Sequence, residues 1–200
     1  MDKILKWGLI ALGTGVVGFV GYFLFVVYAL SSVFDTTHTK ADLINNYKSK
    51  SREIVALSTY INNLVPAGHQ VDIEFDGQET IPIFHVQTGE VYSSNWGVGW
   101  NSGRADTLLQ QLGWPRQTLL ALQEKLDAAG CISIASGDPC KVGYQRSGMS
   151  KYSYNVFARP MSDSLKEAYN NGCRYIYYNN RVALEYGGGA MGPDCFEQTQ

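Results

Sequence analysis

The chain has 200 residues, of which 45% are hydrophobic and 17% are charged, and its formal net charge is −2. This length and apolar content suit one modest folded domain and exclude a disordered or collagen-like chain. The small net charge argues against nucleic acid as a partner, because phosphate binding requires a basic excess. The shortage of charge is local, since residues 7–34 contain no Asp, Glu, Lys, Arg or His.

The uncharged run predicts a transmembrane helix over residues 7–34. A bilayer core needs about 20 helical residues, whereas the apolar part of a cleaved signal peptide spans only about 7–15. A retained anchor is therefore favoured over a signal peptide. Lys3 and Lys6 precede the run, which favours a cytoplasmic tail of residues 1–6 and a periplasmic or extracellular domain of residues 35–200. The expected localisation is that of a single-pass membrane protein.

Small residues recur at helical spacing within this run, at Gly8, Ala11, Gly15 and Gly18. Helix geometry places them on one face, where small side chains allow another helix to approach closely. Besides the lipid bilayer, the pattern suggests a protein partner or a homo-oligomer. Glycine is also frequent in membrane helices generally, so the pattern leaves both interpretations open.

All four cysteines lie in the last third of the chain, without a C-x-x-C pair or a zinc-type spacing with His. An even number in an extracytoplasmic domain indicates disulfides, and three pairings are possible. Pairing of sequence neighbours is the simplest, and four buried reduced thiols are the alternative. The candidates are Cys131, Cys140, Cys173 and Cys195.

Residues 39–65 predict an amphipathic helix. Thr39 and Asp42 have the spacing of a capping box. Apolar residues recur at heptad-like spacing, with an interruption at Lys50. We expect this helix to pack on its own domain, although a coiled coil continuing from the membrane is the alternative.

The remaining segments predict an α+β domain. Asp76-Gly77 marks a turn between two strands, and Pro82 suggests that the second strand lies at an edge. Asn179-Asn180 suits a hairpin turn with left-handed residues. Helices and strands do not alternate regularly, so the sheet is expected to be mainly antiparallel, with two or three short helices. The expected strands are 71–75, 81–86, 131–135, 141–145, 151–158, 174–178 and 181–186, and the expected short helices are 105–112, 115–130 and 164–172.

Motifs that carry chemistry are weak in this chain. Asp72, Glu74 and Asp76 alternate on one strand face and could bind Ca²⁺ or share acid–base work, but ordinary polar-out alternation predicts a solvated face. Residues 187–192 match G-x-G-x-x-G, yet Pro193 follows where a nucleotide-binding helix should begin. The three histidines form no H-E-x-x-H motif. We therefore expect no catalytic residue, metal or cofactor.

The segment W-G-V-G-W, residues 96–100, is the best candidate for a binding site. Aromatic rings can anchor a partner or stack on a sugar, and Arg104 follows as a polar group. Trp96 and Trp100 could equally fill the core. We expect the two rings to differ, with Trp96 projecting from the glycine-rich tip and Trp100 pinning the loop.

The order of an apolar helix, an amphipathic helix, a sheet and late cysteines resembles that of type IV pilins. The family's processing site combines a Gly before an aromatic residue with a Glu shortly inside the apolar helix. This chain lacks that site, because its first Glu is Glu53. The resemblance is therefore one of coarse architecture and assigns no family.

The sequence thus predicts a membrane-anchored extracytoplasmic binding or interaction module of a cell-envelope assembly, with an unspecified ligand. An immunity-type inhibitor protein would be one variety. The alternative is a membrane-tethered, hydrolase-like enzyme that uses Asp72, Glu74 or His85.

Overall fold

The computed structural model describes residues 19–28, 38–77, 79–147, 150–187 and 195–196. The chain forms two compact units, residues 1–37 and residues 38–200. In the first unit, residues 19–28 are helical and carry exposed apolar side chains, such as Phe25 at 68% and Tyr28 at 76% exposure. None of the helices among the described residues is long and apolar enough to cross a bilayer.

Most of the expected membrane span, residues 7–34, lies outside the described residues. The same holds for the small-residue face at Gly8, Ala11, Gly15 and Gly18 and for the glycine-rich stretch 188–192. The spanning helix and its partner face therefore stay predictions.

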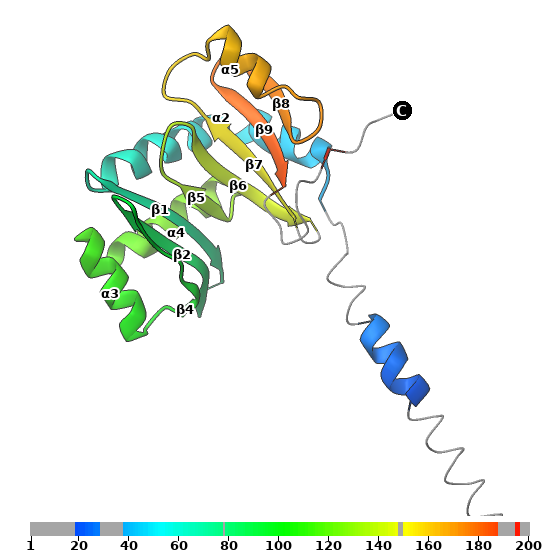
Figure 1. Ribbon diagram of the computed structural model, residues 1–200, viewed down its shortest axis with the longest axis vertical. Helices are drawn as coiled ribbons and strands as arrows, with labels where there is room; N and C mark the ends of the chain where they lie inside the picture. The colour runs from blue at the N-terminus through cyan, green and yellow to red at the C-terminus, as the bar shows by residue number, and fades with distance from the viewer. Residues whose placement is uncertain (1–18, 29–37, 78, 148–149, 188–194, 197–200) are drawn as a thin grey trace, which may run out of the picture. The chain divides into compact units, whose positions relative to one another are not determined.

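The second unit is an α+β domain, as the sequence predicts (Figure 1). Its described strands form one antiparallel sheet in the order β3-β2-β1-β5-β6-β7-β9-β8, and β4 also pairs with β2. The helices are α2 (Lys40–Leu64), α3 (Gly103–Leu112), α4 (Gln117–Ala129) and α5 (Asp163–Ala168), and the strands are β1 (His69–Asp76), β2 (Thr80–Thr88), β3 (Val91–Ser93), β4 (Trp96–Gly99), β5 (Ser133–Ala135), β6 (Cys140–Ser147), β7 (Ser150–Val156), β8 (Tyr175–Asn179) and β9 (Val182–Gly187).

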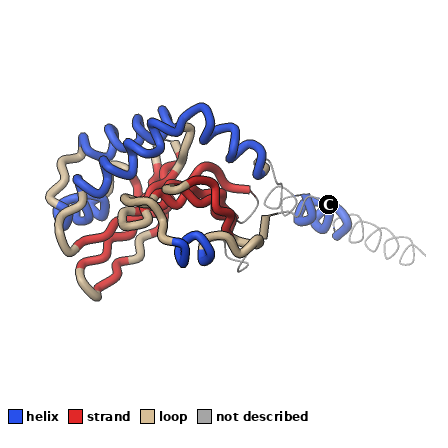
Figure 2. The backbone as a smooth tube through the Cα atoms, turned by 90° about the horizontal axis from the view of Figure 1, so that it is seen from above, coloured by secondary structure: helices blue, strands red, loops and turns tan. Residues whose placement is uncertain are grey.

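The core lies between the sheet and the helices α2 and α4, which pack on each other and run along one face of it (Figure 2). Strand alternation supplies the apolar side chains of this face. The ladder aligns Ile73 of β1 with Ile134 of β5 and, one strand further, Val142 of β6. All three are fully buried. The alternating residues of the strands, many of them polar, point to the opposite face, which is called here the polar face.

Helix α2 begins at the expected capping box. The Thr39 hydroxyl accepts a hydrogen bond from the Asp42 amide at 3.3 Å, and the Asp42 carboxylate accepts one from the Thr39 amide at 2.9 Å. Lys50 leaves helical geometry at φ −124° and ψ 18°, so the interruption in the sequence pattern is a kink. The buried stripe packs on the domain itself, where the Asn46 amide donates to the Ala129 carbonyl at 3.1 Å. The prediction that this helix packs on its own domain is therefore confirmed.

Three local expectations are wrong. Pro82 is not on an edge strand, because β2 pairs with β1 on one side and with β3 and β4 on the other; the β4 ladder is irregular opposite it, so the missing N–H is tolerated. The last hairpin turns at residues 180–181, since Asn179 pairs with Val182, and no described non-glycine residue has positive φ. Helix α5 spans Asp163–Ala168 instead of the expected 164–172, because Ser162 caps it, with its hydroxyl accepting from the Leu165 amide.

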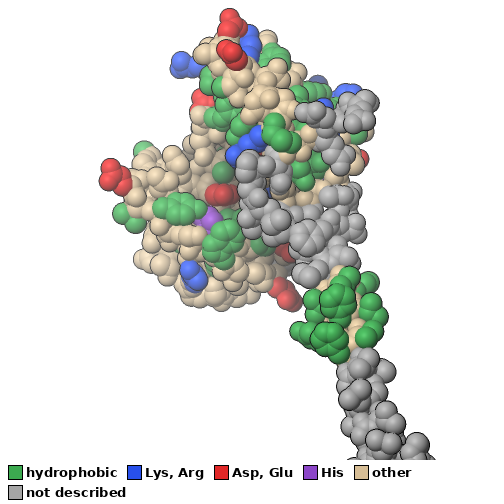
Figure 3. Space-filling view, turned by 45° about the vertical axis from the view of Figure 1, so that its right-hand side comes forward, with side chains coloured by type: hydrophobic (Ala, Val, Ile, Leu, Met, Phe, Trp, Pro, Cys, Tyr) green, Lys and Arg blue, Asp and Glu red, His purple; other side chains and the backbone are tan. Residues whose placement is uncertain are grey.

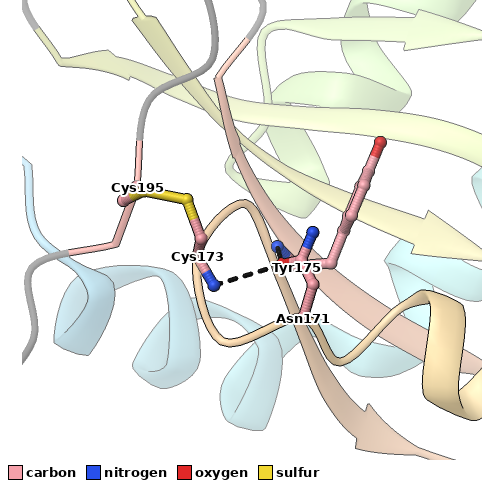
Figure 4. The surroundings of a disulfide bond; sticks show 4 residues. All are labelled: Asn171, Cys173, Tyr175 and Cys195. Atoms are coloured by element: carbon pink, nitrogen blue, oxygen red, sulfur yellow. Dashed lines mark hydrogen bonds between the residues drawn. A yellow bond between two sulfur atoms is a disulfide. The ribbon is translucent and has the colours of Figure 1, made fainter.

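One of the expected disulfides is present, between Cys173 and Cys195 (Figure 4). The Asn171 side-chain oxygen shapes the loop by accepting from the backbone amides of Cys173 and Tyr175, at 3.1 and 3.0 Å. On the other side of the bridge, the buried Phe196 donates its backbone N–H to the Cys173 carbonyl at 3.0 Å. The bridge thus fastens residues 195–196 to the sheet.

The expected local pairing of Cys131 with Cys140 is wrong, because both are free, buried thiols. Cys131 precedes β5 and Cys140 begins β6, so both belong to the core of the sheet. Burial raises the pKa of each thiol to about 12, which keeps both protonated and unreactive.

Candidate functional site

The polar face carries a row of small side chains between two carboxylates. The ladder aligns Glu74 of β1, Ser133 of β5, Gly143 of β6, Ser153 of β7 and Glu185 of β9. Both carboxylates are buried, at 3% and 1% exposure. The expectation of a solvated strand face is therefore wrong for Glu74.

Glu74 is neutralised from two sides. Its carboxylate accepts hydrogen bonds from Arg146 Nε at 2.6 Å and Lys151 Nζ at 2.9 Å, and Lys151 also donates to the Ser133 hydroxyl at 2.8 Å. A side chain at Gly143 would come within 2.0 Å of the Ser133 hydroxyl and 3.0 Å of the Lys151 stem, so glycine leaves the room that Lys151 needs. Burial alone would raise the pKa of Glu74, but the two cations outweigh it and hold the pKa below its ordinary value.

Glu185 repeats this arrangement at the other end of the row. It accepts from Lys141 Nζ at 2.8 Å, from Arg174 Nη2 at 2.6 Å and from the Asn155 amide at 3.0 Å. Burial opposes ionisation, yet these donors lower the pKa of the carboxyl. Both carboxylates are thus held charged and fully engaged, as in structural ion pairs.

His85 organises the other half of the polar face, on β1 to β4. The Tyr92 hydroxyl is hydrogen-bonded to its Nδ1, and the Ser94 hydroxyl is hydrogen-bonded to its Nε2 at 3.2 Å. The rings of Tyr92 and Trp96 stand edge-on to the imidazole, with centroids 5.3 and 4.8 Å away. Burial lowers the pKa of His85, although Asp72 on the adjacent strand opposes the shift.

The rings that His85 holds are exposed to solvent. Trp96 is 62% exposed, Tyr92 57% and the adjacent Val91 72%. Tyr92 and Trp96, which flank His85, are called here the aromatic surface, whereas Val91 alternates to the opposite face of β3. Figure 3 shows a face of the molecule on which hydrophobic side chains lie on both sides of a histidine, in keeping with these contacts. Exposed aromatic clusters of this kind are typical of binding surfaces.

Trp96 begins β4 and Trp100 directly follows that strand, and the two rings differ in exposure as the sequence predicts. Trp100 is only 6% exposed and packs its ring 5.6 Å from that of Phe75. Arg104 lies on α3 and donates from Nε to the Asn95 side-chain oxygen at 2.7 Å. Because Asn95 directly precedes Trp96, this hydrogen bond ties the start of β4 to helix α3.

Tyr92 and Ser94 are members of the site that the sequence does not identify, and the sequence suggests His85 only for the enzymatic alternative. Their proximity depends on strand pairing, which places Tyr92 of β3 opposite Gln87 of β2, two residues beyond His85. The available clue was chemical: a strand that carries a histidine is followed by a short segment that carries a tyrosine, and such residues interact when the two strands pair.

A shallow groove extends from the aromatic surface across the ends of β1 and β5. It consists of a cavity of about 80 Å³ and a second of about 260 Å³, which share Gln70 and Ser136 in their walls. Among the described residues, the side chains of Gln70 and Asp72 have no hydrogen-bond or ion-pair partner, whereas the Gln87 amide donates to the Gly89 carbonyl. The walls are formed by Asn62, Val65, Pro66, Ala67, Gly68, His69, Gln70, Val71, Asp72, His85, Gln87, Tyr92, Ala135, Ser136 and Gly137.

No group of His, Cys, Asp and Glu among the described residues is arranged to hold a metal ion. Comparison with known protein families, with curated proteins and with solved structures finds no match to this chain. Its function must therefore be inferred from the geometry of the site itself.

Proposed function

We propose that the protein is a membrane-anchored, extracytoplasmic binding module of a cell-envelope assembly, and that the aromatic surface contacts its ligand. The observation that carries this proposal is the exposure of Trp96 and Tyr92 in an ordered arrangement. Each ring packs edge-on against the buried His85.

Pre-organisation gives this arrangement its value for binding. A flexible exposed side chain loses rotamer freedom when a ligand immobilises it, at a cost of about 0.5–1.5 kcal/mol. The contacts with His85 restrict Tyr92 and Trp96 before the ligand arrives. Tyrosine and tryptophan are also the residues that contribute most often to binding hot spots.

The titratable groups support binding rather than catalysis. Both ring nitrogens of His85 are hydrogen-bonded within the site, to Tyr92 and Ser94, and its side chain is buried. Glu74 is held by Arg146 and Lys151. Two of the three residues on which an enzymatic role would rest are therefore occupied.

The extracytoplasmic location draws on two features. A disulfide such as Cys173–Cys195 persists in oxidising compartments. The uncharged run of residues 7–34 is long enough to span a bilayer, and the helix of residues 19–28 exposes apolar side chains that lipid would cover.

The test is site-specific photo-crosslinking in living cells. A photoreactive amino acid replaces Trp96 in one strain and Leu120 of α4 in another, because Leu120 is a comparably exposed hydrophobic residue, at 50%, on a different element. We expect a discrete adduct in the membrane fraction from position 96 and none from position 120. Equal or absent labelling at the two positions would reject the aromatic surface as the binding site.

A further inference from the structure

We infer that the ligand of the aromatic surface is an uncharged oligosaccharide, which stacks on Trp96 and Tyr92 and continues along the groove past Asp72 and Gln70. The inference rests on the proposed function and specifies the ligand of the same site. Three properties carry it: the exposed rings at one end, where Tyr92 lines the groove and Trp96 stands on His85 beside it, the unpaired polar side chains of the groove, and its charge.

The aromatic end suits a pyranose ring. Sugar rings present apolar C–H faces and hydroxyl-bearing rims, so they combine stacking on an aromatic ring with hydrogen bonds at the edges. Trp96 and Tyr92 offer exposed rings, and the Tyr92 hydroxyl is already committed to His85. The exposed rings therefore offer chiefly their apolar surface, as stacking requires.

The unpaired polar groups suit the hydroxyl rim. The Gln70 amide has donors and an acceptor, and the Asp72 carboxylate accepts from two hydroxyls at once. Neither side chain has a partner among the described residues. Other polar side chains of the groove already have hydrogen-bond partners. The Ser136 hydroxyl accepts from the Val71 amide at 2.9 Å, and Asn62 exchanges two hydrogen bonds with Gly137.

The charge of the groove disfavours an anionic ligand. None of its described wall residues is Lys or Arg, and Asp72 contributes a carboxylate. The cations of the polar face, by contrast, are turned towards Glu74 and Glu185. A phosphate, an acidic glycan or an anionic lipid headgroup would meet uncompensated repulsion here.

The shape of the groove favours several linked rings over one. Its two cavities, of about 80 and 260 Å³, lie side by side with Gln70 and Ser136 in the walls of both, so a ligand that follows the groove from Tyr92 past Gln70 needs more than one ring. A peptide would instead seek strand pairing at a sheet edge. The edge beside the aromatic surface is β3, which is only three residues long.

The experiment uses the full chain in a detergent without a sugar headgroup, so that the detergent does not compete. Neutral oligosaccharides of hexose and of N-acetylhexosamine units, and uronic acid oligomers as the anionic set, are titrated while tryptophan fluorescence is recorded. We expect a neutral oligosaccharide to shift the emission of the exposed Trp96 to shorter wavelength. Lengthening it from one unit to four should tighten binding at least tenfold, and the uronic acid oligomers should not bind.

Variants identify the site. Trp96→Ala should abolish the fluorescence change and weaken binding at least tenfold, and Asp72→Asn should weaken it severalfold while leaving the melting temperature unchanged. Leu120→Ala is the matched control and should bind like the unmodified protein. Binding that survives both Trp96→Ala and Asp72→Asn would overturn the inference.

The failure of this inference differs visibly from failure of the proposed function. If position 96 crosslinks to a protein in cells while no neutral oligosaccharide binds, the saccharide assignment is wrong and the binding surface stands. If position 96 crosslinks to nothing and no oligosaccharide binds, both are wrong.

Discussion

The two halves of the polar face are built from the same alternation of side chains but reach opposite outcomes. In one half, Glu74 of β1 and Glu185 of β9 terminate a row of small residues, and each is buried between two cations. In the other half, Asp72 lies two residues from Glu74 on β1, has no ion-pair partner among the described residues, and stands beside rings that remain in solvent. A carboxylate with its partners in place contributes to the fold, whereas an unpaired one next to exposed aromatic rings is free for a ligand.

This contrast also separates the roles of neighbouring residues. Arg146, Lys151, Lys141 and Arg174 all turn towards the two buried carboxylates, so the net positive charge of that half is already used within the domain. His85 is the counterpart in the other half, where it holds Tyr92 and Trp96 without compensating a charge.

The largest expected effect concerns the loop that joins the aromatic surface to the core. Trp100→Ala removes a ring that is 6% exposed and should lower the free energy of unfolding by about 3–5 kcal/mol. Trp96→Ala removes a ring in solvent and should change it by no more than about 0.5 kcal/mol. Chemical denaturation of both variants measures the difference.

Trp100→Phe keeps part of the packing against Phe75 and should show an intermediate loss, which guards against a Trp100→Ala variant that fails to fold. Equal losses for Trp96→Ala and Trp100→Ala would mean that Trp96 belongs to the core, and the aromatic surface would lose its main anchor.

The second effect compares the carboxylates of the two halves. Glu185→Gln keeps the shape but removes the charge that Lys141 and Arg174 bind, and should cost about 2–3 kcal/mol of stability. The loss stays below the 3–5 kcal/mol of a fully buried pair because both cations reach solvent.

Asp72→Asn is the matched substitution in the other half and should leave the free energy of unfolding within about 0.5 kcal/mol of the unmodified protein, because Asp72 lacks a partner among the described residues. Denaturation at neutral pH compares the two variants. A loss for Asp72→Asn as large as that for Glu185→Gln would show that the two halves are alike.

The smallest effect is a pH dependence from His85. Burial lowers its pKa in the folded protein below the ordinary value of 6.5. The unfolded chain therefore binds more protons between these two pKa values, and stability should fall as the pH drops through about 6.5, levelling off below the folded-state pKa. Unfolding measured from pH 8 to pH 5 should show this slope, which His85→Gln should remove.

His69→Gln serves as the control, because His69 lies at the far end of the groove and its substitution leaves His85 in place. Fluorescence of Trp96 followed over the same range should change with the stability if His85 positions the ring. An identical slope in the unmodified protein and in His85→Gln would remove His85 from that role.

Much of the fold could be predicted from the chain because its signals are local. The capping box at Thr39, the strands on either side of Asp76-Gly77 and the helix ending at Gly130 depend on neighbours in sequence. The interruption at Lys50 also marked a real kink. Local errors were small shifts, such as the cap at Ser162 and the turn at residues 180–181, where adjacent residues of similar propensity compete.

Pairing between distant segments decided the rest. Alternation alone placed Glu74 on a polar face, but only the ladder through β5 and β6 brought Arg146 and Lys151 to it and buried it. The pairing of β2 with β3 and β4 fixed the site, by bringing Tyr92 and Trp96 to His85.

The sequence by itself determined the uncharged run, the class of the domain, the cysteine count and the difference between Trp96 and Trp100, because hydrophobic periodicity and glycine positions act over a few residues. The tertiary structure alone decided which cysteines pair, which carboxylates are neutralised and which polar groups stay unpaired. Those outcomes depend on contacts between residues far apart in the chain, such as Glu74 with Lys151. The pattern of apolar and polar residues within one strand does not specify which distant residue will pair with it.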